Sequence, residues 1–536
     1  MTRPLRSLPD NPDELRAFAE ALQSRNRVLE DEVYAKTLHI EHLKAQLAAL
    51  RRARFGRSSE KLDRDIEQLE LAIGELEEAK AENDASRTVA PEGATVAAKA
   101  ISLIQKEKGV PVRKALPEHL PRERIDHPAV CTCPACGGSR LSCIGTDERE
   151  VLEYVPSHFK IIVHARPKMS CRDCETITQP CLPSLPIDRG IPGPGLLARV
   201  ITAKYCDHLP LYRQSVIYAR QGVDIERSTM ADWVGRMTYL LKPLAEAIGD
   251  HVRSGQAIHA DDTPMPVLDP GRKQTKTGRL WVAVRDERTW GSTVPPAVYY
   301  QYAPDRRRER AAALLQGCRG YLHADAYSGF KHLYEPGRPI GTPGLKEVGC
   351  WAHARRYLYD VHEKTKSPRA KELLVTIAGL FAIEEQIRGR RPEERLAVRL
   401  RQSVPILTAL KVRFDETLGQ VSAKLTLAEA IRYSTSRWTA MTRFVEDGRL
   451  EMTNNAAERA IRPIAIGRNN WTFAGSDAGG ERAALMYTLI ETAKLNGLDP
   501  EAYLRQVIGC IADHPAKRIA ELLPWNIGQN CSPGGT

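Results

Sequence analysis

Two copies of the tripeptide His-Ala-Asp constrain the fold of this chain more than any other feature, because each ends a short apolar run typical of a β-strand. The first copy ends at Asp261 and the second at Asp325. A third carboxylate, Glu458, lies at the start of a helical pattern among asparagines and arginines. Three carboxylates that converge from two strands and a helix can hold two divalent cations, Mg²⁺ or Mn²⁺, about 4 Å apart. Such a pair can activate a hydroxyl on one side of a phosphodiester and stabilise the leaving oxygen on the other.

The acids Asp261 and Asp262 are neighbours on one predicted strand. Side chains of successive strand residues point to opposite faces of a sheet, so only one of the two acids can face a shared site. The match between the two tripeptides selects Asp261 as the partner of Asp325.

The region around these acids has a recognisable order of elements. Strand-like runs at 279–284 and 297–300 are followed by a helix-like stretch from 304 towards 315 and by a strand that ends at Asp325. Three strands, a helix and a fourth strand, with acids on the first and fourth, predict a ribonuclease H-like catalytic domain at about 251–498.

The long segment between the second and third acids has a mostly helical pattern, which predicts a helical insertion at about 331–450. Near its start, Cys350 and His353 have the spacing of a metal-binding pair. No two further ligands lie close by in the sequence, so we expect packing and DNA contact by His353, Arg355 and Arg356 instead.

Each carboxylate also has a purely structural explanation. Asp325 could cap the turn that follows it, Asp261 could cap a strand, and Glu458 stands three residues after Asn455, as in a capping box. Taken together they favour a catalytic site, because cations and amides that suit DNA phosphates surround the third acid. The candidate DNA contacts in this stretch are Asn454, Arg459, Arg462 and Arg468. A cationic loop between the first two strands adds Arg272, Lys273 and Lys276.

Two Cys-x-x-Cys pairs lie N-terminal to this region. Four thiolates from two such turns can hold one tetrahedral zinc with no open position, so the zinc would be structural. The residues between the pairs alternate like a β-hairpin, which predicts a zinc ribbon at 117–188. The alternative is four ordinary cysteines in turns. The predicted zinc ligands are Cys133, Cys136, Cys171 and Cys174.

A predicted helix-turn-helix occupies 195–250. Its first helix ends near Gln221, and a second helix with Ser228 as its N-cap continues to about Lys242. The start of this recognition helix would present Arg227, Ser228 and Thr229 to DNA. Two consecutive core helices would produce much the same pattern.

Both ends of the chain show helical patterns. A heptad row of leucines predicts a dimeric coiled coil at 12–82, followed by a linker at 83–116. The alternative for the heptad region is a helix that packs onto its own chain. A C-terminal helical tail is expected at 499–530. Taken together, the predicted elements indicate a multidomain α+β or α/β protein. The predicted coiled coil indicates a homodimer or higher oligomer.

Composition limits the partners. The formal net charge of +11 favours a polyanion. No run of about 18 apolar residues occurs, and the first residues lack an apolar signal core. We therefore expect a soluble, cytoplasmic and nucleoid-associated protein with no membrane partner.

Five segments carry a family resemblance: 54–61, 209–214, 259–264, 454–459 and 473–482. They closely resemble the insertion-sequence sixty-six family of bacterial transposases, and the resemblance extends from the heptads almost to the C-terminus. It implies a zinc-finger module, a helix-turn-helix and a ribonuclease H-like domain with the acids Asp261, Asp325 and Glu458. The implied partners are the terminal repeats of the element, target DNA and small accessory proteins.

Two other functions remain open. A structure-selective nuclease on the same fold would share the metal chemistry without strand joining. A zinc-containing DNA-binding regulator would have no catalysis, and would leave the acids unexplained.

Overall fold

The computed structural model describes the chain in seven stretches: 116–129, 131–155, 158–188, 190–269, 274–334, 344–471 and 473–527. The predicted coiled coil at 12–82 lies outside these stretches, as do the predicted linker up to residue 115 and the loop residues Arg272 and Lys273. None of the helices in these stretches combines the length and the apolar content that a membrane span requires.

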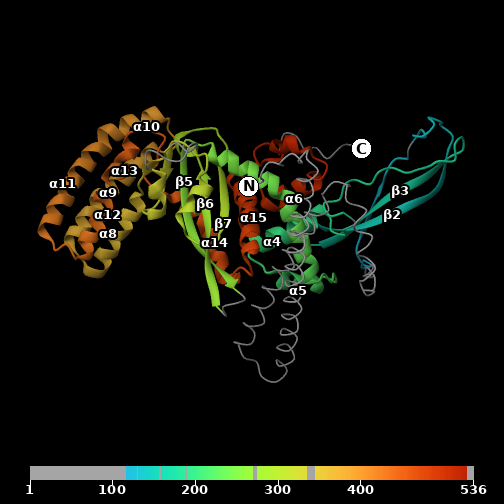
Figure 1. Ribbon diagram of the computed structural model, residues 1–536, viewed down its shortest axis with the longest axis horizontal. Coiled ribbons are helices and arrows are strands. Elements are labelled where there is room, and N and C mark those ends of the chain that lie inside the picture. The colour runs from blue at the N-terminus through green and yellow to red at the C-terminus, as the bar shows by residue number, and fades with distance from the viewer. Residues whose placement is uncertain are drawn as a thin grey trace, which may run out of the picture.

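A five-stranded sheet of order β7-β6-β5-β8-β9 lies at the centre of the molecule (Figure 1). β5, β6 and β7 are antiparallel neighbours, whereas β8 and β9 run parallel to β5. The earliest strand therefore lies in the middle. The strands are β5 (Ala257–Asp269), β6 (Gln274–Arg285), β7 (Ala297–Ala303), β8 (Tyr321–His323) and β9 (Lys346–Val348).

Helix α7 (Arg308–Leu314) connects β7 to β8, so the predicted order of three strands, a helix and a fourth strand is confirmed. β6 shows why the sequence folds this way. Its residues from Leu280 to Val284 are at most 2% exposed. A continuous apolar run suits a strand that is covered on both faces.

The edge strand β7 is covered by helix α15 (Asp477–Leu495). The hydroxyl of Thr488 accepts a hydrogen bond from the Tyr300 amide at 3.0 Å, and that of Thr492 accepts one from the Val298 amide at 3.2 Å. The helix thus satisfies two backbone donors of β7 that would otherwise face outward. Without this cover, the open edge of the sheet would be a template for unwanted strand pairing.

Further helices surround the sheet and the base of the hairpin (Figure 1). α14 packs against β5 and β6, and α6 packs against β6 and β7. They are α4 (Pro194–Tyr205), α5 (Leu211–Arg220), α6 (Arg227–Arg253), α14 (Asn455–Trp471) and α16 (Pro500–Cys510), with 3₁₀ turns at Arg288–Trp290, Ser328–Leu333, Arg443–Val445 and Ala516–Leu522.

The two helices of the predicted helix-turn-helix are α5 and α6, but two details of the prediction are wrong. The N-cap of α6 is Glu226 rather than Ser228, whose hydroxyl instead donates to the Glu226 carboxylate at 3.3 Å. The helix also continues beyond Lys242, through Pro243, to Arg253. The apolar stripe persists after the proline with buried Ile248 and other residues, so packing compensates for the lost backbone hydrogen bond.

A long hairpin of β2 (Leu141–Val155) and β3 (His158–Cys171) projects from one side of the molecule (Figure 1). Tyr154 pairs with Phe159 at its turn end, which confirms the predicted hairpin. The base is anchored because Phe159 packs edge-on against Tyr218 of α5. β1 (Arg122–Asp126) and β4 (Ile177–Thr178) both pair with β3.

On the opposite side, helices gather around a second hydrophobic core (Figure 1). Trp351, Leu380 and Phe414 are fully buried there. The elements are α8 (Trp351–Thr365), α9 (Pro368–Ile387), α10 (Pro392–Val398), a π-turn (Arg399–Ser403), α11 (Val404–Gln420), α12 (Thr426–Thr435) and α13 (Trp438–Thr442).

Buried charges hold this helical group together. The Arg399 side chain is fully buried, and two of its nitrogens donate to the two Glu384 carboxylate oxygens at 2.7 and 2.6 Å. Arg395 is also buried and contacts Glu384 at 3.4 Å and Glu451 at 2.5 Å. Fork-like pairing of this kind satisfies the donors of arginine inside a protein.

We predict that Glu384→Ala destabilises the protein by about 3–5 kcal/mol, because two buried arginines would lose their shared carboxylate. Chemical denaturation followed by far-UV circular dichroism measures this change. The matched control is Glu385→Ala, since Glu385 is the exposed neighbour and should change the free energy of unfolding by about 0.5 kcal/mol or less. Equal effects of the two substitutions would contradict the assigned role.

Candidate active site

The two His-Ala-Asp tripeptides lie side by side, which explains why the motif occurs twice. β5 and β8 are parallel, and His259 is directly paired with His323. The two imidazole rings stack with their centroids 4.2 Å apart. Asp261 and Asp325 each follow their histidine by two residues. Because the two strands run in the same direction, residues two positions beyond the paired histidines come to the same end of the sheet. Residues two apart along a strand also share a face.

The histidines also fix the segment before α14. His323 Nε2 accepts a hydrogen bond from the Glu451 amide at 3.0 Å. The side chain of Asn454 donates to the Ala260 carbonyl at 2.9 Å, and its Oδ1 lies 3.2 Å from His259 Nδ1. These contacts anchor the start of α14 on β5, and Glu458 follows in the first turn of that helix.

Asn454 is fully buried. The prediction that it contacts DNA is therefore corrected: its amide joins α14 to β5 and has no surface for a phosphate. The sequence pattern could not reveal this, because the amide's partners lie almost two hundred residues away.

The three acids form one electrostatic cluster. Burial, together with the charges of Asp325, Asp262 and Glu458, raises the pKa of Asp261 to about 7. In the described part of the chain, neither lysine nor arginine forms an ion pair with Asp261, Asp325 or Glu458. The three acids do not all lie within 4.8 Å of one another in the described structure, but their oxygen donors and like charges are what hard divalent cations require.

Asp262 lies in a different environment. Its side chain is 1% exposed and pairs with Arg279 and with Arg306, the latter at 2.8 Å. The two arginines already balance the charge of the Asp262 carboxylate, so this carboxylate is poorly suited to bind a metal ion. The contrast with Asp261 agrees with the opposite faces expected of neighbouring strand residues.

Asp325 also has the structural role considered from the sequence. Its Oδ1 accepts a hydrogen bond from the Tyr327 amide at 3.0 Å. The second carboxylate oxygen has no such partner among the described residues, so capping the turn does not exclude metal binding.

Two residues that the sequence did not connect with the acids lie beside Glu458. His353 Nδ1 is 3.6 Å from Glu458 Oε1, and burial lowers the pKa of His353 below its usual value. Cys350 is buried, and its sulfur accepts a hydrogen bond from the Asn454 amide at 3.2 Å. Only the Cys-x-x-His spacing signalled this pair, because Glu458 is remote in sequence.

The predicted DNA contacts fall into two groups. Arg355, Arg356, Arg459 and Arg462 are exposed, and Arg227, Ser228 and Thr229 are partly exposed at the start of α6. Two further predicted contacts, Lys276 and Arg468, are engaged by groups of the chain itself. Lys276 pairs with Asp477 at 2.6 Å, and Arg468 donates to the Pro264 carbonyl.

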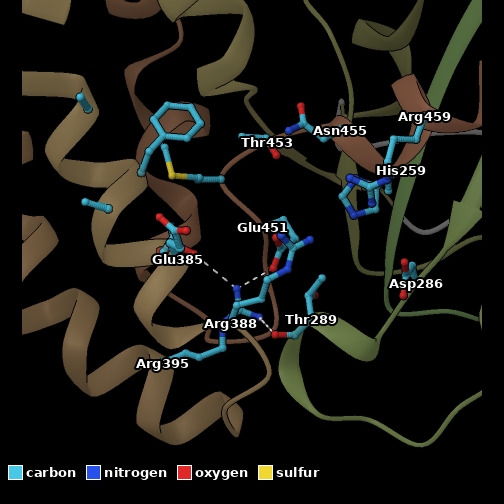
Figure 2. Close-up of a pocket in the computed structure, with 16 residues that line it drawn as sticks. His259, Asp286, Thr289, Glu385, Arg388, Arg395, Glu451, Thr453, Asn455 and Arg459 are labelled. Atoms are coloured by element: carbon cyan, nitrogen blue, oxygen red, sulfur yellow. Dashed lines mark hydrogen bonds and ion pairs between the residues drawn. The ribbon is translucent and has the colours of Figure 1, made fainter. Parts of the chain in front are cut away.

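A cavity of about 460 Å³ lies between α9 and the start of α14. Figure 2 shows Arg459, Asn455 and Thr453 on one side, with Glu385, Arg388 and Arg395 on the other. Arg459 lines this cavity, whereas its neighbour Glu458 and the acids Asp261 and Asp325 are not among the lining residues.

The four predicted zinc ligands are brought together at the end of the hairpin that is remote from the sheet. Cys133 and Cys174 have their sulfurs 3.3 Å apart, and those of Cys136 and Cys171 are 3.8 Å apart. All four sulfurs lie within 4.8 Å of one another. Sulfurs bound tetrahedrally at about 2.3 Å from zinc would be about 3.8 Å apart, so the cluster suits one structural zinc.

The sequence also matches models of known protein families. The model described as the transposase IS66 family matches residues 189–482, which is more than half of the chain. This chain belongs to the IS66 transposase family. The zinc-finger binding domain of transposase IS66 matches 131–175, and the IS66 C-terminal element matches 488–525. A fourth model, described as transposase C of IS166 homeodomain, matches 42–125.

Similar proteins occur in Sinorhizobium fredii. The protein y4hP is 41% identical over 456 residues, covering 82% of this chain and 80% of the relative. The protein y4qI is 40% identical over 417 residues, covering 77% of each. The protein y4jD is 36% identical over 415 residues, covering 77% of this chain and 81% of the relative. All three are described as uncharacterised, so they support the family assignment without adding an activity.

We predict that the purified chain holds one tightly bound zinc at the cysteine cluster, and that Cys133→Ser or Cys174→Ser lowers the tightly bound zinc by about one equivalent. Atomic absorption on extensively dialysed protein measures the content. Cys143→Ser is the matched control, because Cys143 is exposed on β2 outside the cluster. Unchanged zinc after both cluster substitutions would contradict the assignment.

Proposed function

We propose that this chain is a DNA transposase in which Asp261, Asp325 and Glu458 form the catalytic acidic triad. The observation that carries the proposal is the direct pairing of His259 with His323, which brings two acids together at one end of the sheet. The strand order β7-β6-β5-β8-β9 supports a ribonuclease H-like core, with acids at the middle strand and just after its parallel neighbour.

The donor set suits two Mg²⁺ or Mn²⁺ ions, which take oxygen ligands in preference to nitrogen or sulfur. When bound, such ions supply Lewis acidity at the phosphate and favour the ionised form of an attacking hydroxyl. The chain itself contributes the carboxylates and keeps them in register. The anchored start of α14 places Glu458 near enough to Asp261 for its charge to raise the pKa of that acid.

DNA would follow the exposed cations around this cluster. Arg459 and Arg462 project from α14, and Arg355 and Arg356 from α8, on either side of Glu458 and His353. Backbone contacts of this type position a duplex without reading its sequence. Sequence-dependent contacts would come from Arg227, Ser228 and Thr229 at the start of α6, if α5 and α6 act as a helix-turn-helix.

The proposed reaction is cleavage at the ends of the element followed by joining of a 3′ end to target DNA. Two ends must be held together for this reaction, so we propose a homodimer or higher oligomer on DNA, with accessory proteins of the element as further partners. The metal chemistry alone would equally serve a nuclease that does not join strands, and the experiment below separates the two.

We predict that Asp261→Asn and Glu458→Gln each reduce cleavage of DNA carrying the element's ends by more than about 100-fold. Loss of a residue that merely supports a metal ligand already costs about 10–100-fold. Binding of the same DNA in a gel-shift assay should persist, because the acids hold metal and do not read sequence.

The matched control is Asp262→Asn, which removes a neighbouring carboxylate paired with arginines and should retain cleavage at a temperature where the protein is folded. An inactive Asp262→Asn beside an active Asp261→Asn would overturn the choice of acid. Joining of the cut 3′ end to a second duplex by the wild-type protein would support a transposase; cleavage without joining would favour a nuclease. Metal-independent binding with no cleavage would favour a regulator.

A further inference from the structure

A second group of potential metal ligands lies where α8 meets α14. It consists of the Cys350 sulfur, a ring nitrogen of His353 and a carboxylate oxygen of Glu458, which all lie within 4.8 Å of one another. In the described part of the chain only this group and the four cysteines combine three or more such ligands at this spacing. The two groups lie in different parts of the fold.

The geometry at the histidine is close to that of a shared metal. His353 Nδ1 and Glu458 Oε1 are 3.6 Å apart. Nitrogen and oxygen ligands of one tetrahedral zinc, at about 2.0–2.2 Å from it, lie about 3.4 Å from each other. His353 Nδ1 is also buried without a hydrogen-bond partner. A buried nitrogen in this state is costly unless something fills the missing interaction.

The thiol is placed as a ligand would be. Cys350 is 1% exposed and occupies the N-cap position of α8, although its sulfur accepts no capping hydrogen bond from that helix. The Asn454 amide donates to that sulfur at 3.2 Å. This donor favours the thiolate, the form of cysteine that binds metals, but burial outweighs it and raises the pKa of Cys350 to about 11, so a cation that binds here must displace the thiol proton.

We propose that Cys350, His353 and Glu458 form a second site for a thiophilic divalent cation such as Zn²⁺. The ligand set selects the class of cation, because sulfur and imidazole favour zinc, whereas Mg²⁺ demands oxygen ligands. Binding replaces the thiol proton of Cys350, which is released to solvent, and forms a sulfur–zinc bond.

This site differs from the cysteine cluster in its openness. Three protein ligands leave one tetrahedral position for water or another donor, whereas four thiolates leave none. Glu458 is 38% exposed and gives the cation a path from solvent. We therefore expect zinc here to be bound more weakly than zinc at the four cysteines.

The inference goes beyond the proposed function, because metal occupancy can be measured whether or not the chain cleaves DNA. Its consequence rests on that function: Glu458 would be shared between two sites, and a zinc ion between α8 and α14 would draw its carboxylate away from Asp261 and Asp325.

The experiment is equilibrium dialysis of the full chain against Zn²⁺, with bound zinc counted per chain. We expect two equivalents for the wild-type protein, of which one exchanges more readily. Cys350→Ser and His353→Gln should each retain only the tight equivalent. Cys318→Ser is the matched control, since Cys318 is another buried free thiol outside the group, and it should retain both.

A second measurement covers the case in which a variant folds poorly. Co²⁺ added to zinc-loaded wild-type protein should occupy the weaker site and produce the absorption of a cobalt–thiolate bond. Cys350→Ser should lose that absorption while circular dichroism reports an intact fold. The proposal is overturned if the wild-type protein binds only one equivalent, or if Cys350→Ser and His353→Gln both retain two.

Discussion

The parallel pairing of β5 with β8 is the constraint on which the acid cluster depends. Burial lowers the pKa of both His259 and His323, so the stacked rings are neutral and can pack face to face without charge repulsion. The same rings hydrogen-bond the segment that precedes α14. One buried contact therefore links the three segments, distant in the sequence, that carry Asp261, Asp325 and Glu458.

Charge is distributed in two contrasting ways around this contact. In the helical group, Arg395 and Arg399 are buried with carboxylates that balance them, which makes the group rigid and electrostatically closed. The acid cluster is the reverse, since Asp261 is largely buried among like charges. Such an arrangement is costly for an isolated chain, and it persists because the sheet fixes the backbone that carries it.

Much of this organisation could be predicted from sequence wherever the determining interactions are local or repeated. The duplicated tripeptide indicated Asp261 and Asp325, alternation indicated the β2–β3 hairpin, and paired cysteines indicated the zinc ligands. Prediction failed where a side chain forms a hydrogen bond with a residue that is distant in the sequence. Asn454 donates to the Ala260 carbonyl of β5 instead of facing DNA. Likewise, Cys350 and His353 acquire a third ligand only when α14 folds against α8. The predicted N-cap failed for a local reason, because the N-cap of α6 is Glu226, two residues before Ser228.

The hairpin has a geometric consequence for contact with long partners. Its turn end is fixed to α5, and the four cysteines lie at the other end (Figure 1). β3 runs from His158 to Cys171, which at about 3.3 Å per residue corresponds to a reach of about 40 Å. That length equals about 12 base-pair steps of B-DNA at 3.4 Å each. A tilt of a few degrees at the base would shift the cysteine end by a large part of one step. If the cysteine module contacts a duplex, the stiffness of the hairpin would therefore limit how precisely that contact is placed.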